Sequence, residues 1–164
     1  MKESGRMSIQ KVREYLKQFG LENRIVEFSV SSATVDLAAQ ALGTEPGCIA
    51  KSISFHGNPD GCLLIVTAGD AKIDNSKFKA EFGCKAKMLK GDEVEEMTGY
   101  QIGGVCPFDN PPETNVYCDV SLKRFEKVYP AAGTDSSCVE LSCDELFQTS
   151  RSIKWVDVCK MKEV

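Results

Sequence analysis

CIAKSISFHGNPDGCLLIVTA, residues 48–68, contains two strand-like runs separated by a turn. Residues 48–55 alternate between apolar and small or polar side chains, which is typical of a strand with one buried face. The following HGNPDG is rich in turn-forming residues, and residues 62–68 return to an almost continuous apolar run. The stretch therefore predicts a β-hairpin in which strand 48–55 pairs with strand 62–68.

Lys51 lies in the first of these runs, on the face that also carries Ile49 and Ile53. An unpaired ammonium group is costly to bury, so this position needs an explanation. Lys51 could protect an edge strand, or its stem could cross the apolar surface and leave the amine in water. Alternatively, the amine faces a partly dry cavity and binds an anionic or carbonyl oxygen there. Spacing alone leaves these explanations open.

The remaining patterns predict helices and strands that alternate along the chain without internal repeats or a linker. Residues 1–7 are expected to form a flexible tail, and residues 8–164 one α/β or α+β domain. The predicted elements are a helix capped by Ser8 and stopped by Gly20, a strand at 24–29, a helix between Thr34 and Gly43, a helix between Asp74 and Gly83, a strand at 84–89, a helix with a capping box of Asp92 and Glu95, strands at 114–120 and 127–133 around a turn, a strand at 138–142, a helix at 143–150 and a strand at 153–158.

Composition is that of an ordinary soluble domain. The chain has 164 residues, of which 42% are hydrophobic and 27% charged, and its longest apolar run, CLLIV, is far too short to span a bilayer. The first residues contain no hydrophobic signal core, so we expect a cytoplasmic protein with no membrane contact. A net charge of -4 argues against a long nucleic-acid track and against DNA binding, although it leaves room for a local basic patch.

Eight cysteines are present, but no two of them form a CxxC pair, and His56 is the single histidine. Disulfide frameworks belong to short secreted chains, so reduced thiols are expected here. Tetrahedral zinc ligation would need distant cysteines to converge. The prediction is therefore no metal and no cofactor, with a cysteine-rich thiol or metal-binding protein as the least favoured alternative.

The loop GYQIGGVCPF, residues 99–108, is the second candidate for chemistry. Gly103 and Gly104 permit close backbone approach, and exposed amides can form an oxyanion hole for acyl transfer; the alternative is a plain turn. Cys106 could be a nucleophile only with a neighbouring base or positive charge, and His56 is predicted to lie in a turn. The segment YPAAG, 129–133, supplies either a shallow pocket wall or a simple strand end.

Taken together, these stretches resemble the bacterial YbaK/ProX family of aminoacyl-tRNA deacylases, which includes the editing domain of some prolyl-tRNA synthetases. The resemblance covers about residues 8–158 and rests on IAKS at 49–52, TGYQIGGVCPF at 98–108, VYCDV at 116–120 and YPAAG at 129–133. Each motif is short, but their ordered combination is fairly specific. It implies a curved mixed sheet, partly closed like a barrel and flanked by helices.

The resemblance also implies a set of site residues. It assigns catalysis to Lys51, Gly103 and Gly104, with Lys51 anchoring a phosphate or ribose oxygen of the terminal nucleotide while the glycine loop polarises the carbonyl. It assigns substrate binding to Val105, Cys106, Pro107, Phe108, Ala132 and Gly133. One departure is that Asp109 stands where several relatives have a glycine.

The implied reaction is hydrolysis of the ester between a wrong amino acid and the 3′ end of a tRNA. A prolyl-tRNA synthetase cannot strongly reject small amino acids, because small apolar differences give only about 10- to 200-fold discrimination. Alanyl- and cysteinyl-tRNA(Pro) are therefore the expected substrates, and a prolyl-tRNA synthetase is an expected partner. The alternative is a non-catalytic sensor of an amino acid or aminoacyl-tRNA that uses the same pocket.

Overall fold

The computed structural model describes residues 2–29, 34–57 and 59–161, with side chains from residue 7 onward. The helices are α1 (Lys2–Lys17), α2 (Val35–Leu42), α3 (Asn75–Phe82), α4 (Gly91–Thr98) and α5 (Cys143–Thr149). The strands are β1 (Ile25–Glu27), β2 (Ile49–His56), β3 (Cys62–Ala68), β4 (Ala71–Ile73), β5 (Thr114–Asp119), β6 (Tyr129–Pro130), β7 (Ser137–Val139), β8 (Trp155–Val156) and β9 (Cys159–Met161).

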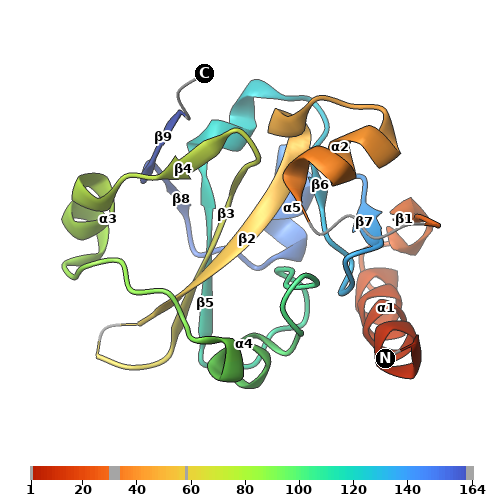
Figure 1. Cartoon of the computed structure of the whole chain (residues 1–164), viewed down its shortest axis with the longest axis horizontal. Helices are drawn as coiled ribbons and strands as arrows, with labels where there is room; N and C mark the ends of the chain where they lie inside the picture. The colour runs from red at the N-terminus through yellow and green to blue at the C-terminus, as the bar shows by residue number, and fades with distance from the viewer. Residues whose placement is uncertain (1, 30–33, 58, 162–164) are drawn as a thin grey trace.

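A five-stranded sheet in the order β6-β2-β3-β5-β8 forms the centre of the molecule (Figure 1). The β2–β3 hairpin is antiparallel with Lys51 opposite Thr67, which confirms the predicted hairpin, whereas the other pairings in this sheet are parallel. Every residue of β3 is buried, as expected for a central strand. The predicted single-domain α/β fold with a mixed sheet is therefore confirmed.

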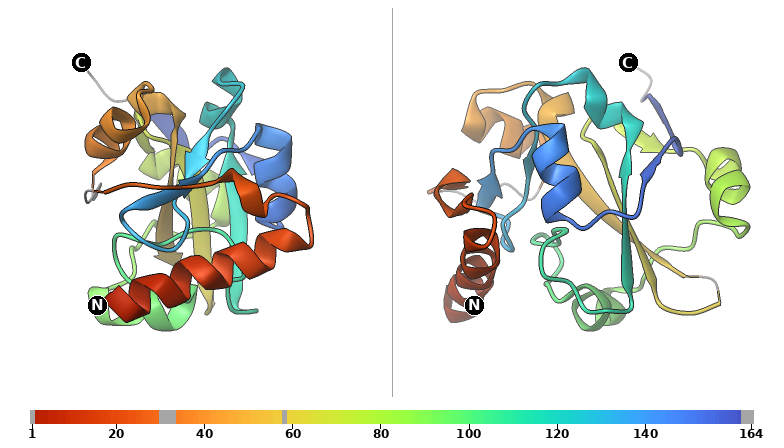
Figure 2. Two further views of the ribbon diagram at one scale, coloured as in Figure 1. Left: turned by 90° about the vertical axis from the view of Figure 1, so that its right-hand side faces the viewer. Right: turned by 180° about the vertical axis from the view of Figure 1, so that it is seen from behind.

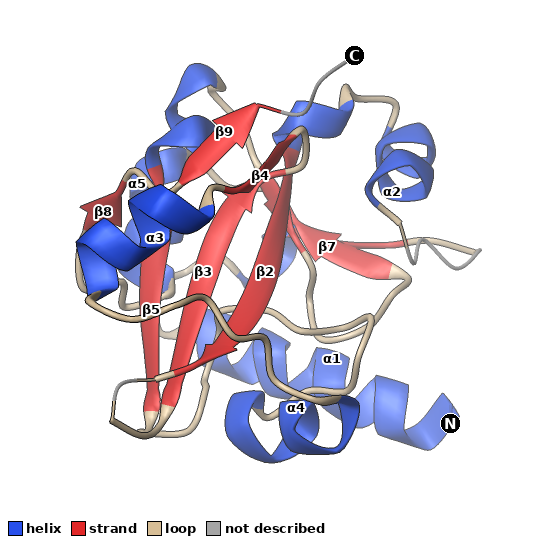
Figure 3. Cartoon of the chain, turned by 60° about the vertical axis from the view of Figure 1, so that its left-hand side comes forward, coloured by secondary structure: helices blue, strands red, loops and turns tan. Residues whose placement is uncertain are grey.

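Helices flank this sheet (Figure 1), and β1-β7 and β4-β9 form two separate small sheets. Seen from behind, α5 covers the back of the sheet (Figure 2). Helices α1 and α4 lie at the same end of the sheet (Figure 3), where Lys11 Nζ on α1 sits 4.5 Å from the centre of the Tyr100 ring. None of the helices in the described ranges is long and apolar enough to cross a membrane.

The local helix signals predicted from the sequence are confirmed for α2 and α3. Thr34 Oγ1 accepts a hydrogen bond from the Leu37 amide at 3.2 Å, and Gly43 ends α2 in the left-handed conformation. Asp74 caps α3 in the same way, and Gly83 ends it. These devices depend on residues within one turn of each other, which is why the sequence reveals them.

Two predicted helix starts are wrong. Helix α1 begins at Lys2, so Ser8 lies inside the helix and does not cap it, because the helical segment extends through the charged residues that precede the apolar stripe. The flexibility predicted for residues 1–7 stays a prediction. The capping box at α4 is formed two residues earlier than predicted: Glu93 accepts a hydrogen bond from the Lys90 amide at 3.0 Å, and Asp92 lies within the helix.

Two predicted strand assignments are also wrong. Residues 84–89 contain only an isolated bridge between Met88 and Phe55. The predicted strand 127–133 is reduced to β6, which pairs with β2, whereas β5 lies on the far side of β3. The two segments around the 121–125 turn are therefore separated by the hairpin.

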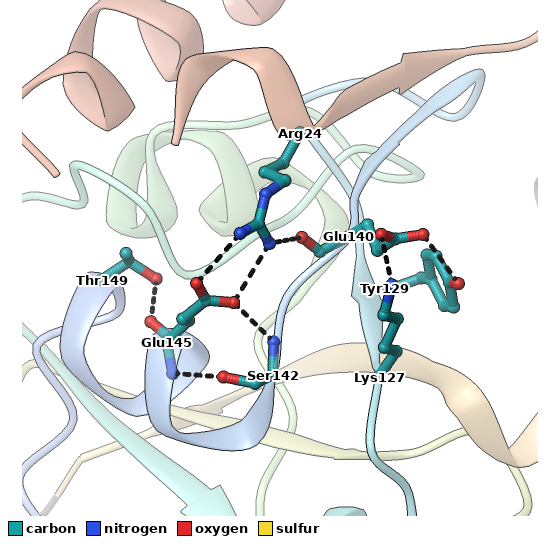
Figure 4. A network of polar contacts seen from close by, with 7 residues as sticks. All are labelled: Arg24, Lys127, Tyr129, Glu140, Ser142, Glu145 and Thr149. Atoms are coloured by element: carbon teal, nitrogen blue, oxygen red, sulfur yellow. Dashed lines mark hydrogen bonds and ion pairs between the residues drawn. The ribbon is translucent and has the colours of Figure 1, made fainter. Parts of the chain in front are cut away.

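A polar network ties the chain around β6 and β7 to helix α5 (Figure 4). Arg24 donates to both carboxylate oxygens of Glu145, at 3.2 and 3.3 Å, and to the main-chain oxygen of Glu140 at 3.2 Å. The Glu140 carboxylate in turn accepts from Lys127 at 3.0 Å and from the Tyr129 hydroxyl at 3.1 Å. These partly exposed pairs add little stability individually, but together they fix Tyr129, which lines the cavity described next.

Candidate functional site

A cavity of about 380 Å³ lies along the outer edge of β2. Residues 49–54 of that strand form one wall, so the cavity contacts both faces of the strand. Its other walls come from the start of α2, the 88–94 segment, the 102–105 loop and residues 129–138. The volume is in the usual range for small-molecule sites.

Lys51 is half-buried and lies on the cavity wall. Its Nζ donates a hydrogen bond to the main-chain carbonyl oxygen of Ala71 in β4. The Asp70 carboxylate is nearby: its pKa is lowered chiefly by its hydrogen bond to Arg124, and the Lys51 charge lowers it further. The ammonium group thus has a main-chain oxygen as its acceptor and a carboxylate close by, which explains how a strand can carry it between two isoleucines.

The glycine loop forms another part of the cavity wall. Gly103 adopts φ +95, a conformation that favours glycine, and lines the cavity together with Val105. Gly104 is buried, and a Cβ added there would lie 2.3 Å from the main-chain oxygen of Gly133. The loop and the YPAAG segment therefore touch backbone to backbone, at a separation that only glycine allows.

The C-terminal part of the loop packs into the core. Cys106, Pro107 and Phe108 are buried, and the Tyr100 hydroxyl donates to the main-chain oxygen of Phe108. Asp109 adopts φ 53, in the left-handed region that favours glycine and that Asp tolerates. A glycine would adopt this backbone conformation without strain.

The structure places some of the predicted site residues on the cavity wall and buries others outside it. Lys51, Gly103 and Val105 line the cavity. Gly104 contacts the Gly133 backbone, and this contact positions the loop. Cys106, Pro107, Phe108 and Ala132 are buried residues outside the cavity lining. Their predicted contact with substrate stays a prediction, and the structure gives them a packing role.

Cys106 is poorly suited to be a nucleophile. Burial raises the pKa of its thiol to about 12, so almost no thiolate is present at neutral pH. His56 Nε2 lies 3.4 Å from Glu93 Oε1 and is thereby engaged with a carboxylate. All eight cysteines are free thiols, and within the described ranges no three His, Cys, Asp or Glu side chains are grouped to hold a metal ion.

Sequence reasoning missed Ser52 as a site residue. Its Oγ is buried without a hydrogen-bond partner, the one such side-chain atom found in the described part of the chain, and Ser52 lines the cavity. Buried polar groups are normally hydrogen-bonded, so this atom marks an unusual place in the wall. A serine in an alternating strand gives no sequence signal for this role.

These features define a small single-domain α/β protein with one strand edge exposed to a ligand-sized cavity. The protein-family model described as the aminoacyl-tRNA editing domain matches residues 30–149 of this chain. The chain therefore belongs to the aminoacyl-tRNA editing domain family, and the resemblance to YbaK/ProX deacylases is confirmed.

Three relatives illustrate the match. An uncharacterized protein of Bacillus subtilis (strain 168), YwhH, is 52% identical over 94% of this chain and 98% of its own length. The multifunctional Ser/Thr-tRNA deacylase ProXp-y of Escherichia coli (strain K12) is 26% identical over 87% of this chain and 88% of its own length. The solved structure of a candidate trans-editing enzyme for prolyl tRNA synthetase is 29% identical, with a TM-score of 0.85 over 93% of this chain and 97% of that one.

Proposed function

We propose that this protein is a trans-acting deacylase that hydrolyses the ester of mischarged tRNA, with alanyl- and cysteinyl-tRNA(Pro) as its expected substrates. The observation that carries the proposal is the cavity along β2, which Lys51 and Gly103 both line, in a chain of the editing family. Its volume of about 380 Å³ suits a small amino acid and part of the terminal nucleotide.

Hydrolysis of an aminoacyl ester requires no strong base or nucleophile from the protein. An aminoacyl ester is already activated, so a positioned water can attack once the carbonyl is polarised and the nucleotide is anchored. Lys51 anchors a phosphate or ribose oxygen, and the loop at Gly103 and Gly104 supplies main-chain polarity near the carbonyl. Neither the buried Cys106 thiol nor the His56–Glu93 pair is needed for this scheme.

The test is a panel of tRNA(Pro) charged with alanine, cysteine, serine, threonine or proline. We expect one of the small amino acids to be released about 100-fold faster than in protein-free buffer, as one well-placed oxyanion donor can provide. Prolyl-tRNA should be spared. Binding of aminoacyl-tRNA without release of any amino acid would instead support the sensor function.

Three exposed lysines flank the cavity and fit a tRNA backbone. Lys85, Lys87 and Lys90 belong to the 84–90 segment, which places Met88 and Leu89 on the cavity wall. Within the described ranges none of the three forms an ion pair. Because α4 just beyond carries an acidic exposed surface, the expected path of the phosphates is along 84–90.

Changing Lys85, Lys87 and Lys90 together to glutamine is expected to raise KM for aminoacyl-tRNA about 10-fold or more at low salt while kcat is retained. The slope of log binding constant against log salt should fall by about 2, since each phosphate contact on a single strand contributes about 0.7. The control carries the same change at Lys72, Lys79 and Lys160, exposed lysines that lie outside the 84–90 segment and, among the described residues, also form no ion pair. Equal salt slopes in the two triple variants would exclude this surface.

A further inference from the structure

The outer edge of β2 is paired at both ends and open in the middle. Ile49 and Ala50 pair with β6. At the other end, the Leu89 amide donates to the Ser54 carbonyl at 3.2 Å, and the His56 amide donates to a main-chain carbonyl at 2.8 Å. Between these two sites, no strand of the described ranges pairs with residues 51–53 on this side.

The main-chain groups of Ser52 point out of the open edge. In an antiparallel ladder, the residues whose N–H and C=O face one side alternate with those that face the other. Ser54 and His56 use their groups on the outer side, so Ser52 faces the same way while Lys51 and Ile53 bond to β3. No loop or side chain of the described residues bonds to the Ser52 amide or carbonyl across this edge. Both groups therefore face the cavity that Ser52 lines.

We propose that the Ser52 main chain holds the aminoacyl group of the substrate as if it were one residue of an added strand. This inference rests on the proposed function. An α-aminoacyl ester carries an ammonium donor and a carbonyl acceptor in the same arrangement as a strand residue, and a directly opposed antiparallel pair exchanges both hydrogen bonds. The α-ammonium donates to the Ser52 carbonyl, and the Ser52 amide donates to the ester carbonyl and polarises it.

The antiparallel direction places the rest of the substrate. In an antiparallel pair, the atoms that follow the ester carbonyl lie opposite the residue before Ser52, which is Lys51. The ribose oxygen therefore lies beside Lys51 along the strand. The substrate side chain shares the face of Ser52, whose buried Oγ lacks a partner. Water attacks the carbonyl carbon, the bond from that carbon to the ribose oxygen breaks, and the ribose oxygen takes a proton. The products are the free amino acid and the 3′-hydroxyl of the tRNA.

The first test uses the wild-type protein and two stable adenosine analogues, in which alanine or propionate is attached through a 3′-amide. The alanyl analogue is expected to bind about 10-fold more tightly, because only it can donate to the Ser52 carbonyl. It should also slow hydrogen exchange of the Ser52 amide, measured by NMR, about 10-fold or more relative to the free protein. Equal affinity of the two analogues, or an unprotected Ser52 amide in the alanyl complex, would overturn the proposal.

The second test compares Ser52→Pro with Ser52→Ala. Proline removes the outward N–H without touching the β3 ladder, whereas alanine removes only the hydroxyl. The kcat/KM of Ser52→Pro should be about 30-fold or more below that of Ser52→Ala. Ile53→Pro removes an amide that bonds to β3, so this variant should unfold at a much lower temperature than Ser52→Pro. Equal kcat/KM in the two Ser52 variants would contradict the proposal.

The two proposals fail in different ways. If the wild-type protein hydrolyses no ester, the proposed function fails, while analogue binding and Ser52 amide exchange still decide the inference on the strand edge. If Ser52→Pro does not fold, the wild-type measurements decide it alone. Hydrolysis by the wild type together with equal binding of both analogues would retain the deacylase and reject the Ser52 contact.

Discussion

Replacing Lys51 by methionine is expected to lower kcat/KM for ester hydrolysis about 100-fold while the protein stays folded. The loss corresponds to about 2.7 kcal/mol of transition-state stabilisation, a magnitude that one charge-assisted contact to the nucleotide can supply. Methionine keeps an unbranched stem over the apolar surface, so the change removes the ammonium group with little loss of packing. The measurements are steady-state hydrolysis of the best ester in the panel and thermal unfolding followed by circular dichroism.

Two variants separate the charge from the geometry. Lys51→Arg restores a positive charge but not the compact ammonium that fits the Ala71 carbonyl, so it should recover only part of the activity. Lys72→Met makes the same chemical change at an exposed lysine next to Ala71 and should hydrolyse the ester at the wild-type rate. Full activity in Lys51→Met would exclude Lys51 from the reaction and leave it the role of protecting the strand edge.

The position of Lys51 illustrates what the sequence can and cannot predict. The alternation of residues 48–55 predicts the strand, the face and the presence of an unusual charge on it. The acceptor for that charge is the main-chain carbonyl of Ala71, twenty residues away, and a carbonyl oxygen leaves no trace in the residue types. The sequence therefore identifies the anomaly, and the structure supplies its partner.

For the fold, too, the sequence predicts features that depend on neighbouring residues better than features that depend on distant ones. The β2–β3 hairpin and the caps of α2 and α3 depend on neighbouring residues, and all are predicted correctly. The errors in the strands lie where pairing is non-local: β6 pairs with β2 over only two residues, and segment 84–89 contributes one bridge to the same edge. These two incomplete pairings leave the open edge at Ser52, so the feature that the sequence predicts least well is the one that forms the candidate site.

Gly104→Ala is expected to destabilise the protein by about 2–3 kcal/mol and to reduce ester hydrolysis more than 10-fold. The new Cβ would lie 2.3 Å from the Gly133 oxygen and 2.6 Å from the Gly133 carbonyl carbon. Ser8 of α1 packs close to Gly133, since a Cβ built on Gly133 would lie 3.0 Å from Ser8, and this limits how far Gly133 can shift. The 102–105 loop would therefore have to move away from YPAAG, and Gly103 would leave its place on the cavity wall.

Gly91→Ala provides a matched control for this change, because Gly91 also lies on the cavity wall and begins α4. Its added Cβ would meet only the end of the Ile102 side chain, at 3.4 Å, and Gly-to-Ala within a helix is favourable by up to about 1 kcal/mol. Urea unfolding and steady-state hydrolysis of both variants give the comparison. If Gly104→Ala matched Gly91→Ala in both measurements, the backbone contact with Gly133 would not shape the cavity. A loss confined to Gly104→Ala would show that the glycine motif acts by letting two chain segments touch, which is a steric requirement that neither motif reveals when read alone.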